Sequence, residues 1–498
     1  MRSSTGTGGP GYKLLNVWRS ANFRNSVWNI AEVLLTPAVF FVSIPLFLHL
    51  LGAEGYGEWM FFNTLIVVLQ LFDFGLSIST YKHIAQNIAT NRTKASAVLL
   101  HTNILLSLFI CLGIVLLFLL LYSLRGYLPQ GLARLVISAD GLICTLISCG
   151  ILFTKLAEKI LYSAFRAYEQ FKTVTILSIF SKLIVVPATA LMAYLYQSVT
   201  GILFTVLVFQ FLGLVLLRLR LRPYLEVDFF SFRFRLTSLR LQLGYSVYAW
   251  LQSIAVVVAY QMDRLFVSLA FGMATLSYYS IAAALFSYIH MALMALTPWL
   301  FPKVARMAAK PEKVQYLYFY ARNITAVISI PLLTLFGVMY PYVIPWWLGT
   351  GRFEEVDGFL KWFTVFELFF IFTINQYTYL NAAGQGRLAL LITLMFTGLN
   401  ILGMALGYWL ISTPESLPAG LALSSVPAMY CLHYIIGRYL KQSNSALHSL
   451  LLIIPSLCAS GIVLFSTVYV QICLVLPLVL SLYFIFLKPV LQTKRLSS

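Results

Sequence analysis

The stretch that decides the fold is LGAEGYGEWMFFNTLIVVLQLFDFGLSISTYKHIAQ, which runs from Leu51 to Gln86. It begins with a turn rich in glycine and continues as an apolar run from Phe61 to Leu71. Asp73 and Gly75 interrupt this run, and the basic pair Lys82–His83 follows them. The pattern predicts a helical hairpin that turns at one face of a bilayer, crosses it, and reaches the other face at the basic residues.

The composition of the whole chain is that of a membrane protein. It has 498 residues, of which 60% are hydrophobic and 10% charged, and its mean hydropathy is +0.87. A soluble globular domain carries about 25% charged residues. Because the apolar runs are continuous rather than alternating, they predict an all-α polytopic membrane protein and not a β-barrel. The net charge of +18 matches the excess of Lys and Arg in cytoplasmic loops, so we expect no nucleic-acid partner.

Hydropathy divides the chain into about 14 transmembrane helices, in two six-helix lobes around a central cavity plus a terminal helix pair. The predicted parts are an N-terminal lobe at 1–217, a basic cytoplasmic linker at 218–240, a C-terminal lobe at 241–440, and the terminal pair with its tail at 441–498. In the linker, Phe and Arg alternate from Phe230 to Arg235, which predicts an interfacial segment on anionic headgroups. The expected spans are about 26–50, 59–81, 97–122, 131–156, 174–196, 200–217, 241–271, 275–300, 317–340, 359–380, 388–410, 417–436, 450–469 and 472–487.

The distribution of Lys and Arg predicts the orientation of these spans. With the N-terminus placed inside, only four of the 34 Lys and Arg residues fall on outside segments, namely Arg125, Arg134, Arg352 and Lys361. The positive-inside rule therefore predicts that both termini are cytoplasmic. The longest outside loop is expected at about Pro341 to Gly358.

Two motifs resemble a known family. The residues Leu51-Gly52, Tyr56-Gly57 and Asp73-Phe74-Gly75-Leu76 resemble the first hairpin of the polysaccharide flippases, in the multidrug/oligosaccharidyl-lipid/polysaccharide (MOP) exporter superfamily. Asp263-Arg264-Leu265-Phe266, with Leu269 and Gly272 after it, resembles the seventh helix of that family. A weak internal repeat between these two regions favours lobes related by an axis along the membrane normal.

The resemblance implies a function and its partners. It implies a flippase that moves a lipid-diphosphate-linked oligosaccharide, an O-antigen or capsule repeat unit, from the cytoplasmic to the periplasmic leaflet by alternating access. The implied location is the bacterial inner membrane. The implied partners are a polyprenyl-diphosphate-linked oligosaccharide, membrane lipids and polysaccharide-assembly proteins.

Charged residues inside spans are the candidates for a substrate site, because they are costly there and usually face a cavity or a partner. Arg264, beside Asp263 in the seventh span, is predicted to face the cavity and hold phosphate. The alternative is that both residues bond neighbouring helices, since adjacent residues on a helix point about 100° apart. Lys182 in the fifth span either lines the cavity or extends toward the interface.

Three acidic residues are candidates for ion coupling or for pairing with a cation inside the protein. Glu32 and Asp73, in the first two spans, could bind a proton or sodium ion, but pairing with Lys182 or Arg264 is the safer interpretation. Glu367, in the tenth span, is a weaker candidate. His290, in the eighth span, is expected to be a hydrogen-bonded core residue rather than a ligand.

Enzyme motifs are missing from the sequence: it has no HExxH, no P-loop and no GxSxG. We therefore expect no enzyme activity, no catalytic residue, no cofactor and no metal site. Two alternatives to the flippase stay open. A cation-coupled drug antiporter of the same superfamily would use Glu32 or Asp73, and a membrane glycosyl polymerase would need long outer loops with catalytic acids.

Overall fold

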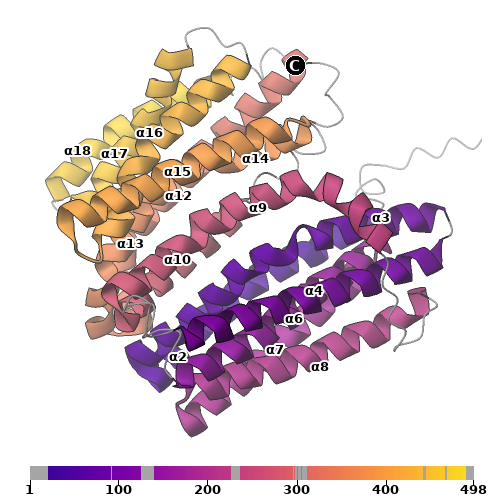
Figure 1. Ribbon diagram of the computed structural model, residues 1–498. Helices are drawn as coiled ribbons and strands as arrows, with labels where there is room; N and C mark the ends of the chain where they lie inside the picture. Colours follow the sequence, from indigo (N-terminus) through magenta and orange to yellow (C-terminus); the bar gives the residue numbers. More distant parts are fainter. Residues whose placement is uncertain are drawn as a thin grey trace, which may run out of the picture. The chain divides into compact units, whose positions relative to one another are not determined.

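The computed structural model describes residues 21–90, 92–124, 139–225, 236–294, 311–440, 445–465 and 468–489, together with residues 297, 300 and 304. The chain forms two compact units (Figure 1). Unit 1 comprises Met1–Leu50 and Phe72–Ser246, and unit 2 comprises Leu51–Leu71 and Val247–Ser498. The N-terminal tail and the Phe/Arg alternation predicted at 230–235 lie outside the described residues.

Unit 1 is a bundle of long helices built around α6 (Ala139–Ala167), which packs against α3, α4, α7 and α8. Its core is aliphatic, with Ile160, Leu161 and Phe165 of α6 almost fully buried. On α4, by contrast, leucines such as Leu116 and Leu120 are more than half exposed, as expected for a helix that faces lipid. The other helices are α3 (Leu76–Ala89), α4 (Thr93–Ser123), α7 (Phe171–Tyr196) and α8 (Val199–Leu225).

The stretch from Leu51 to Gln86 bends twice. Helix α2 (Ala21–Leu69) turns sharply at Gly52, where φ is 71° and ψ is 178°. Gly57 lies inside the helix against α10, where a Cβ would overlap the carbonyl oxygen of Met273. The short η1 (Gln70–Asp73) then ends at Phe74 and Gly75, whose φ angles of 48° and 73° are left-handed. The interruption predicted at Asp73 and Gly75 is confirmed, and the predicted glycine turn is reduced to one residue.

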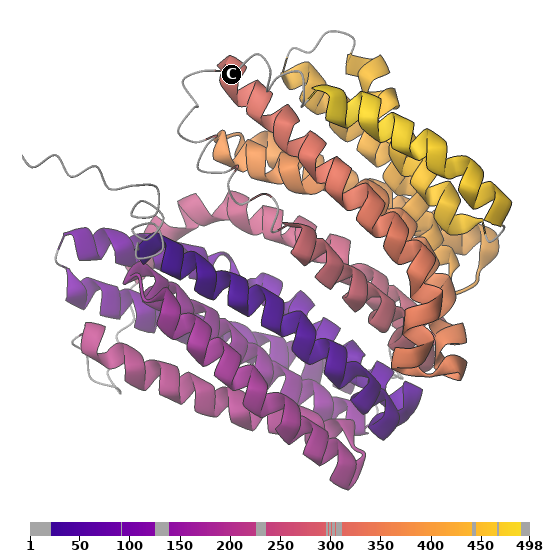
Figure 2. The same cartoon turned by 180° about the vertical axis from the view of Figure 1, so that it is seen from behind.

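Unit 2 continues from the same stretch and contains the remaining helices, which Figures 1 and 2 show from opposite sides. Helices α13 and α14 are one apolar segment broken at Ile371–Phe372, and the hydroxyl of Ser456 on α17 donates to the Leu368 carbonyl of α13 (2.8 Å). The helices are α9 (Leu236–Phe271, in unit 2 from Val247), α10 (Met273–Met294), α12 (Pro311–Leu348), α13 (Thr350–Phe370), α14 (Thr373–Ala382), α15 (Gly386–Ile411), α16 (Ser416–Tyr439), α17 (Ser445–Leu464), α18 (Val468–Ser481) and the π-helical η3 (Leu482–Leu487).

Helices α15 and α16 lie side by side in both views (Figures 1 and 2) because glycines line their interface. A Cβ at Gly403 would overlap the Gly420 carbonyl oxygen, and a Cβ at Gly407 would overlap the Ser416 carbonyl oxygen. Small residues four positions apart let two membrane helices approach to backbone contact. This close contact fixes α15 beside the cavity described below.

The all-α fold predicted from hydropathy is confirmed, and every predicted span has a helical counterpart within the described residues. Within the described residues, ten helices are long and apolar enough to cross a membrane, and the pair Phe41–Asp73 and Leu76–Ile88, bent by 46°, would be an eleventh span. The prediction of a loop at Pro341 to Gly358 is wrong, because this segment is helical: α12 continues to Leu348, and Gly349 alone separates it from α13. Pro341 and Pro345 lie inside α12, since membrane helices accept Pro where neighbours satisfy the backbone.

Candidate functional site

Asp263 anchors α9 to α10 in unit 2. Its side chain is 5% exposed. One carboxylate oxygen, Oδ2, accepts a hydrogen bond from the Tyr279 hydroxyl (2.7 Å), and the other, Oδ1, accepts one from the backbone N–H of Arg264 (2.8 Å). Both oxygens therefore have protein donors, as a buried carboxylate requires. A direct contact of Asp263 with substrate stays a prediction.

Arg264 is half-buried and interacts electrostatically with Asp263 and with three tyrosines. The tyrosines are Tyr56, Tyr279 and Tyr288. Within the described parts of the chain, no carboxylate lies within 4 Å of its guanidinium, and its buried Nε–H has no hydrogen-bond partner. A guanidinium has five N–H donors and stays charged. Arg264 is therefore a cation in unit 2 whose Nε–H is available to donate a hydrogen bond to a ligand.

Tyr56 reaches this cation because of the glycine that follows it. The absence of a side chain at Gly57 lets the second segment of α2 contact the first turn of α10 at Met273. Tyr56 is buried, with its ring edge-on to Trp59 at 5.8 Å between centroids. Gly272, just before α10, has a left-handed φ of 87°, so a glycine bend precedes each of the two segments that meet here.

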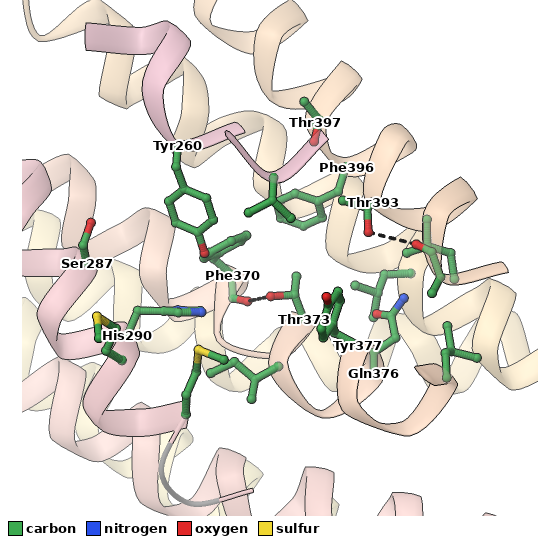
Figure 3. Close-up of a pocket in the computed structure, with 18 of the residues that line it drawn as sticks. Tyr260, Ser287, His290, Phe370, Thr373, Gln376, Tyr377, Thr393, Phe396 and Thr397 are labelled. Carbon is green, nitrogen blue, oxygen red and sulfur yellow. Dashed lines mark hydrogen bonds between the residues drawn. The ribbon is translucent and has the colours of Figure 1, made fainter. Parts of the chain in front are cut away.

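A cavity of about 460 Å³ opens one helical turn from Arg264 in unit 2 (Figure 3). It lies among α9, α10, α13, α14, α15 and α16, and the described residues that line it include no Lys, Arg, Asp or Glu. Tyr260 lines it from α9, four residues before Arg264. Four residues on a helix rise about 6 Å and return to nearly the same face. The cation and the neutral cavity are thus neighbours along α9.

His290, which lines the cavity, is paired with the buried Glu367. Nδ1 of His290 lies 2.6 Å from Oε1 of Glu367, and the two side chains are only 8% and 3% exposed. The His290 ring stacks on Phe370 at 4.8 Å between centroids and points into the cavity (Figure 3). The prediction that His290 is a hydrogen-bonded core residue is confirmed. A role for Glu367 in ion coupling stays a prediction.

The other predicted residues lie in unit 1. Asp73 accepts a hydrogen bond from the Ser77 hydroxyl (2.7 Å) and interacts electrostatically with Lys159. Lys182 is half-buried on α7 and has a partner of its own. Glu32 lies on α2, at a position whose side chain is outside the described residues. Whether Lys182 shares a site with Arg264 stays a prediction.

Sequence reasoning missed a second buried polar contact in unit 1. The guanidinium of Arg218, on α8, lies 3.3 Å from Nε2 of His101, on α4. Arg218 was assigned to the linker because a basic run begins there, but α8 continues to Leu225. The signal available in the sequence was His101 itself, a polar residue near the start of an apolar span.

Comparison with known proteins agrees with this architecture. A family model described as polysaccharide biosynthesis protein matches residues 49–355, more than half of the chain. No curated protein matches the chain significantly.

Solved structures share the fold at low sequence identity. An inward-facing multidrug resistance MATE transporter of the MOP superfamily has a TM-score of 0.62 and 14% identity, over 82% of this chain and 96% of that one. A MOP superfamily transporter from Pyrococcus furiosus, whose binding pocket is described as reversed in polarity, has a TM-score of 0.58 and 14% identity, over 85% and 96%. The lipid II flippase MurJ, in an inward closed conformation, has a TM-score of 0.59 and 13% identity, over 93% and 97%. The chain thus belongs to the polysaccharide biosynthesis protein family and has the fold of the MOP superfamily transporters.

Proposed function

We propose that the protein is a flippase that moves a lipid-diphosphate-linked oligosaccharide across the membrane by alternating access. The observation that carries this proposal is Arg264, a half-buried cation that lacks a carboxylate partner among the described residues and lies between tyrosine side chains. A buried charge is normally paired. A phosphate oxygen of the substrate would supply the missing anion.

The chemistry of the site suits a diphosphate. A planar guanidinium binds phosphate through charge-assisted hydrogen bonds, about twice as strong as neutral ones. The hydroxyl of Tyr56, which interacts electrostatically with Arg264, can donate to a further phosphate oxygen. The sugar head needs such a protein passage, because each hydroxyl that loses water in hydrocarbon costs several kcal/mol.

The proposed direction is from the cytoplasmic to the periplasmic leaflet of a bacterial inner membrane, with both termini cytoplasmic. A potential that is negative inside drives anions outward by about 2.3 kcal/mol per charge per 100 mV. For two charges this amounts to about 4–5 kcal/mol. The potential and the consumption of product outside would then drive export without obligatory ion coupling, and flipping that continues unchanged after the potential is collapsed would contradict this.

Export of a cationic drug is less compatible with the Arg264 site. Both oxygens of Asp263 accept hydrogen bonds from the protein, and the half-buried Arg264 beside it would repel a cation. Of the carboxylates named for the antiporter, Asp73 has one oxygen, Oδ1, without a hydrogen-bond partner among the described residues, so the antiporter stays the alternative to the flippase. An enzyme activity is not part of the proposal, because the sequence lacks the HExxH, P-loop and GxSxG motifs.

Complementation tests the proposed function. A strain that lacks its polysaccharide flippase would receive wild type, Arg264→Ala, Arg264→Lys or the control Arg438→Ala, which removes an exposed basic residue of unit 2. Surface glycan and the amount of membrane-inserted protein would be scored together. We expect wild type and Arg438→Ala to restore glycan, Arg264→Lys to restore it in part, and Arg264→Ala to fail at normal protein levels. No restoration by wild type, across strains with different glycans, would refute the flippase assignment.

A further inference from the structure

The cavity beside Arg264 has the size and the chemistry of a binding site for a neutral ring. At about 460 Å³ it lies within the range of small-molecule sites, which are mostly apolar with a few convergent polar groups. Its polar groups include His290 and Tyr260, which enter from α10 and α9 and point toward the same space (Figure 3). No hydrogen bond joins Nε2 of His290 or the Tyr260 hydroxyl to another group in the described parts of the chain.

The pairing with Glu367 decides which atom of His290 is left for a ligand. Nδ1 of His290 lies 2.6 Å from Oε1 of Glu367 in a buried environment. Nε2 is therefore the ring nitrogen that has no hydrogen-bond partner among the described residues. An imidazole nitrogen donates when it carries a hydrogen and accepts when it does not, so Nε2 offers a hydrogen-bonding position to a ligand in either tautomer.

Threonine hydroxyls supply the matching acceptors. The hydroxyls of Thr373, Thr393 and Thr397 line the cavity and donate to backbone carbonyls at 2.7, 2.8 and 3.3 Å. Each hydroxyl oxygen keeps lone pairs that can accept. A ligand that both donates and accepts, such as one carrying hydroxyl groups, fits this mixture. A purely apolar ligand would leave Nε2 of His290 without a hydrogen-bond partner.

Aromatic rings form the rest of the wall. Tyr260 and Phe370 lie edge to face at 5.5 Å, and Phe396 lies 5.3 Å from Phe370. Such faces pack against the C–H surfaces of a ring, while the polar groups meet its hydroxyls. Because no charged Lys, Arg, Asp or Glu side chain lines the cavity, a phosphate group would not be stabilised here.

We propose that this cavity binds one neutral, hydroxylated ring of the transported head group, with His290 and Tyr260 as hydrogen-bonding residues. The inference rests on the proposed function and adds a sugar subsite to it. Tyr260 and Arg264 lie on nearly one face of α9, about 6 Å apart along the helix. A diphosphate held by Arg264 would thus present the sugar attached to it at the mouth of the cavity.

A direct binding experiment tests the subsite without requiring transport. The purified full-length protein in lipid nanodiscs would be titrated with methyl N-acetylglucosaminide, which is neutral and carries no lipid, and binding measured by saturation-transfer NMR. The variants are Tyr260→Phe, which removes one hydroxyl, and the double variant His290→Leu with Glu367→Leu, which removes the imidazole and leaves no carboxylate unpaired. The matched control is Tyr318→Phe, because the buried Tyr318 hydroxyl forms no hydrogen bond and lies outside the cavity.

The expected result is binding to wild type and to Tyr318→Phe, with affinity lowered about three- to tenfold in Tyr260→Phe and in the double variant. Thermal unfolding of each variant would verify folding. Absence of sugar binding in wild type, or equal binding in all folded variants, would overturn the subsite. Binding of farnesol but not of the sugar would assign the cavity to a lipid chain and would overturn the subsite. Wild type that binds sugar yet fails complementation would refute the proposed function alone.

Discussion

The contact at Gly57 gives a prediction whose size follows from the structure. In Gly57→Ala the new Cβ would overlap the Met273 carbonyl oxygen and lie 2.6 Å from the Met273 carbonyl carbon. Ordinary van der Waals contact begins near 3.4 Å, so the second segment of α2 must move from α10 by more than about 0.8 Å to clear both carbonyl atoms. Overpacking of this kind costs about 1–3 kcal/mol. The gain in helix propensity from Gly to Ala offsets about 0.5–1 kcal/mol of that.

The expected net effect is therefore a loss of up to about 2.5 kcal/mol relative to wild type, or a thermal midpoint lowered by up to about 5 °C. The assay is thermal unfolding of the purified protein followed by fluorescence. The matched control is Gly398→Ala on α15, where a Cβ meets no atom within 4 Å, and this variant should match wild type or exceed it. Since Gly57 also positions Tyr56, the variant should flip substrate more slowly as well. A Gly57→Ala protein as stable as Gly398→Ala would refute the reasoning.

Three further predictions concern the packing of unit 2. Gly420→Ala places a Cβ 2.7 Å from a carbonyl carbon of α15 and should cost about 1–3 kcal/mol, measured against Gly398→Ala. In a double-mutant cycle, Asp263→Asn and Tyr279→Phe should show a coupling energy of about 1–2 kcal/mol, and strictly additive effects would show that their 2.7 Å hydrogen bond contributes nothing. His290→Leu alone should destabilise by about 3–5 kcal/mol because it leaves a buried Glu367 unpaired, and adding Glu367→Leu should recover part of that loss, whereas two full, independent losses would contradict the pairing.

Hydropathy was sufficient to predict the all-α fold because a segment that crosses lipid must satisfy its backbone hydrogen bonds internally, and an α-helix does so. The break at Asp73 and Gly75 followed from residue types that interrupt apolar helices. The segment around Pro341 was mispredicted because the sequence pattern does not reveal whether a proline lies in a loop or inside a helix supported by neighbours. In this protein Gly349 alone ends the helix.

The site was only partly predictable. Arg264 and Asp263 stood out because charges are rare in spans. The neighbours of Arg264 did not, since Tyr56 lies far away in the sequence and reaches it only through the Gly57 contact. The pairing of His290 with Glu367, 77 residues apart, depends equally on tertiary packing. Sequence patterns identify charged residues that are costly to place in a membrane span, but the tertiary fold determines which residues pair with them.

The measurement that tests the central claim most directly is flipping in proteoliposomes. A lipid-diphosphate-linked oligosaccharide would be added to vesicles that contain wild type, Arg264→Lys or Arg264→Ala, and its appearance in the opposite leaflet followed with a membrane-impermeant lectin. A charge-assisted hydrogen bond is worth about 1.5–3 kcal/mol, so Arg264→Ala should flip about 10- to 150-fold more slowly, with Arg264→Lys in between. Flipping by Arg264→Ala at the wild-type rate would contradict the claim that this arginine holds the diphosphate.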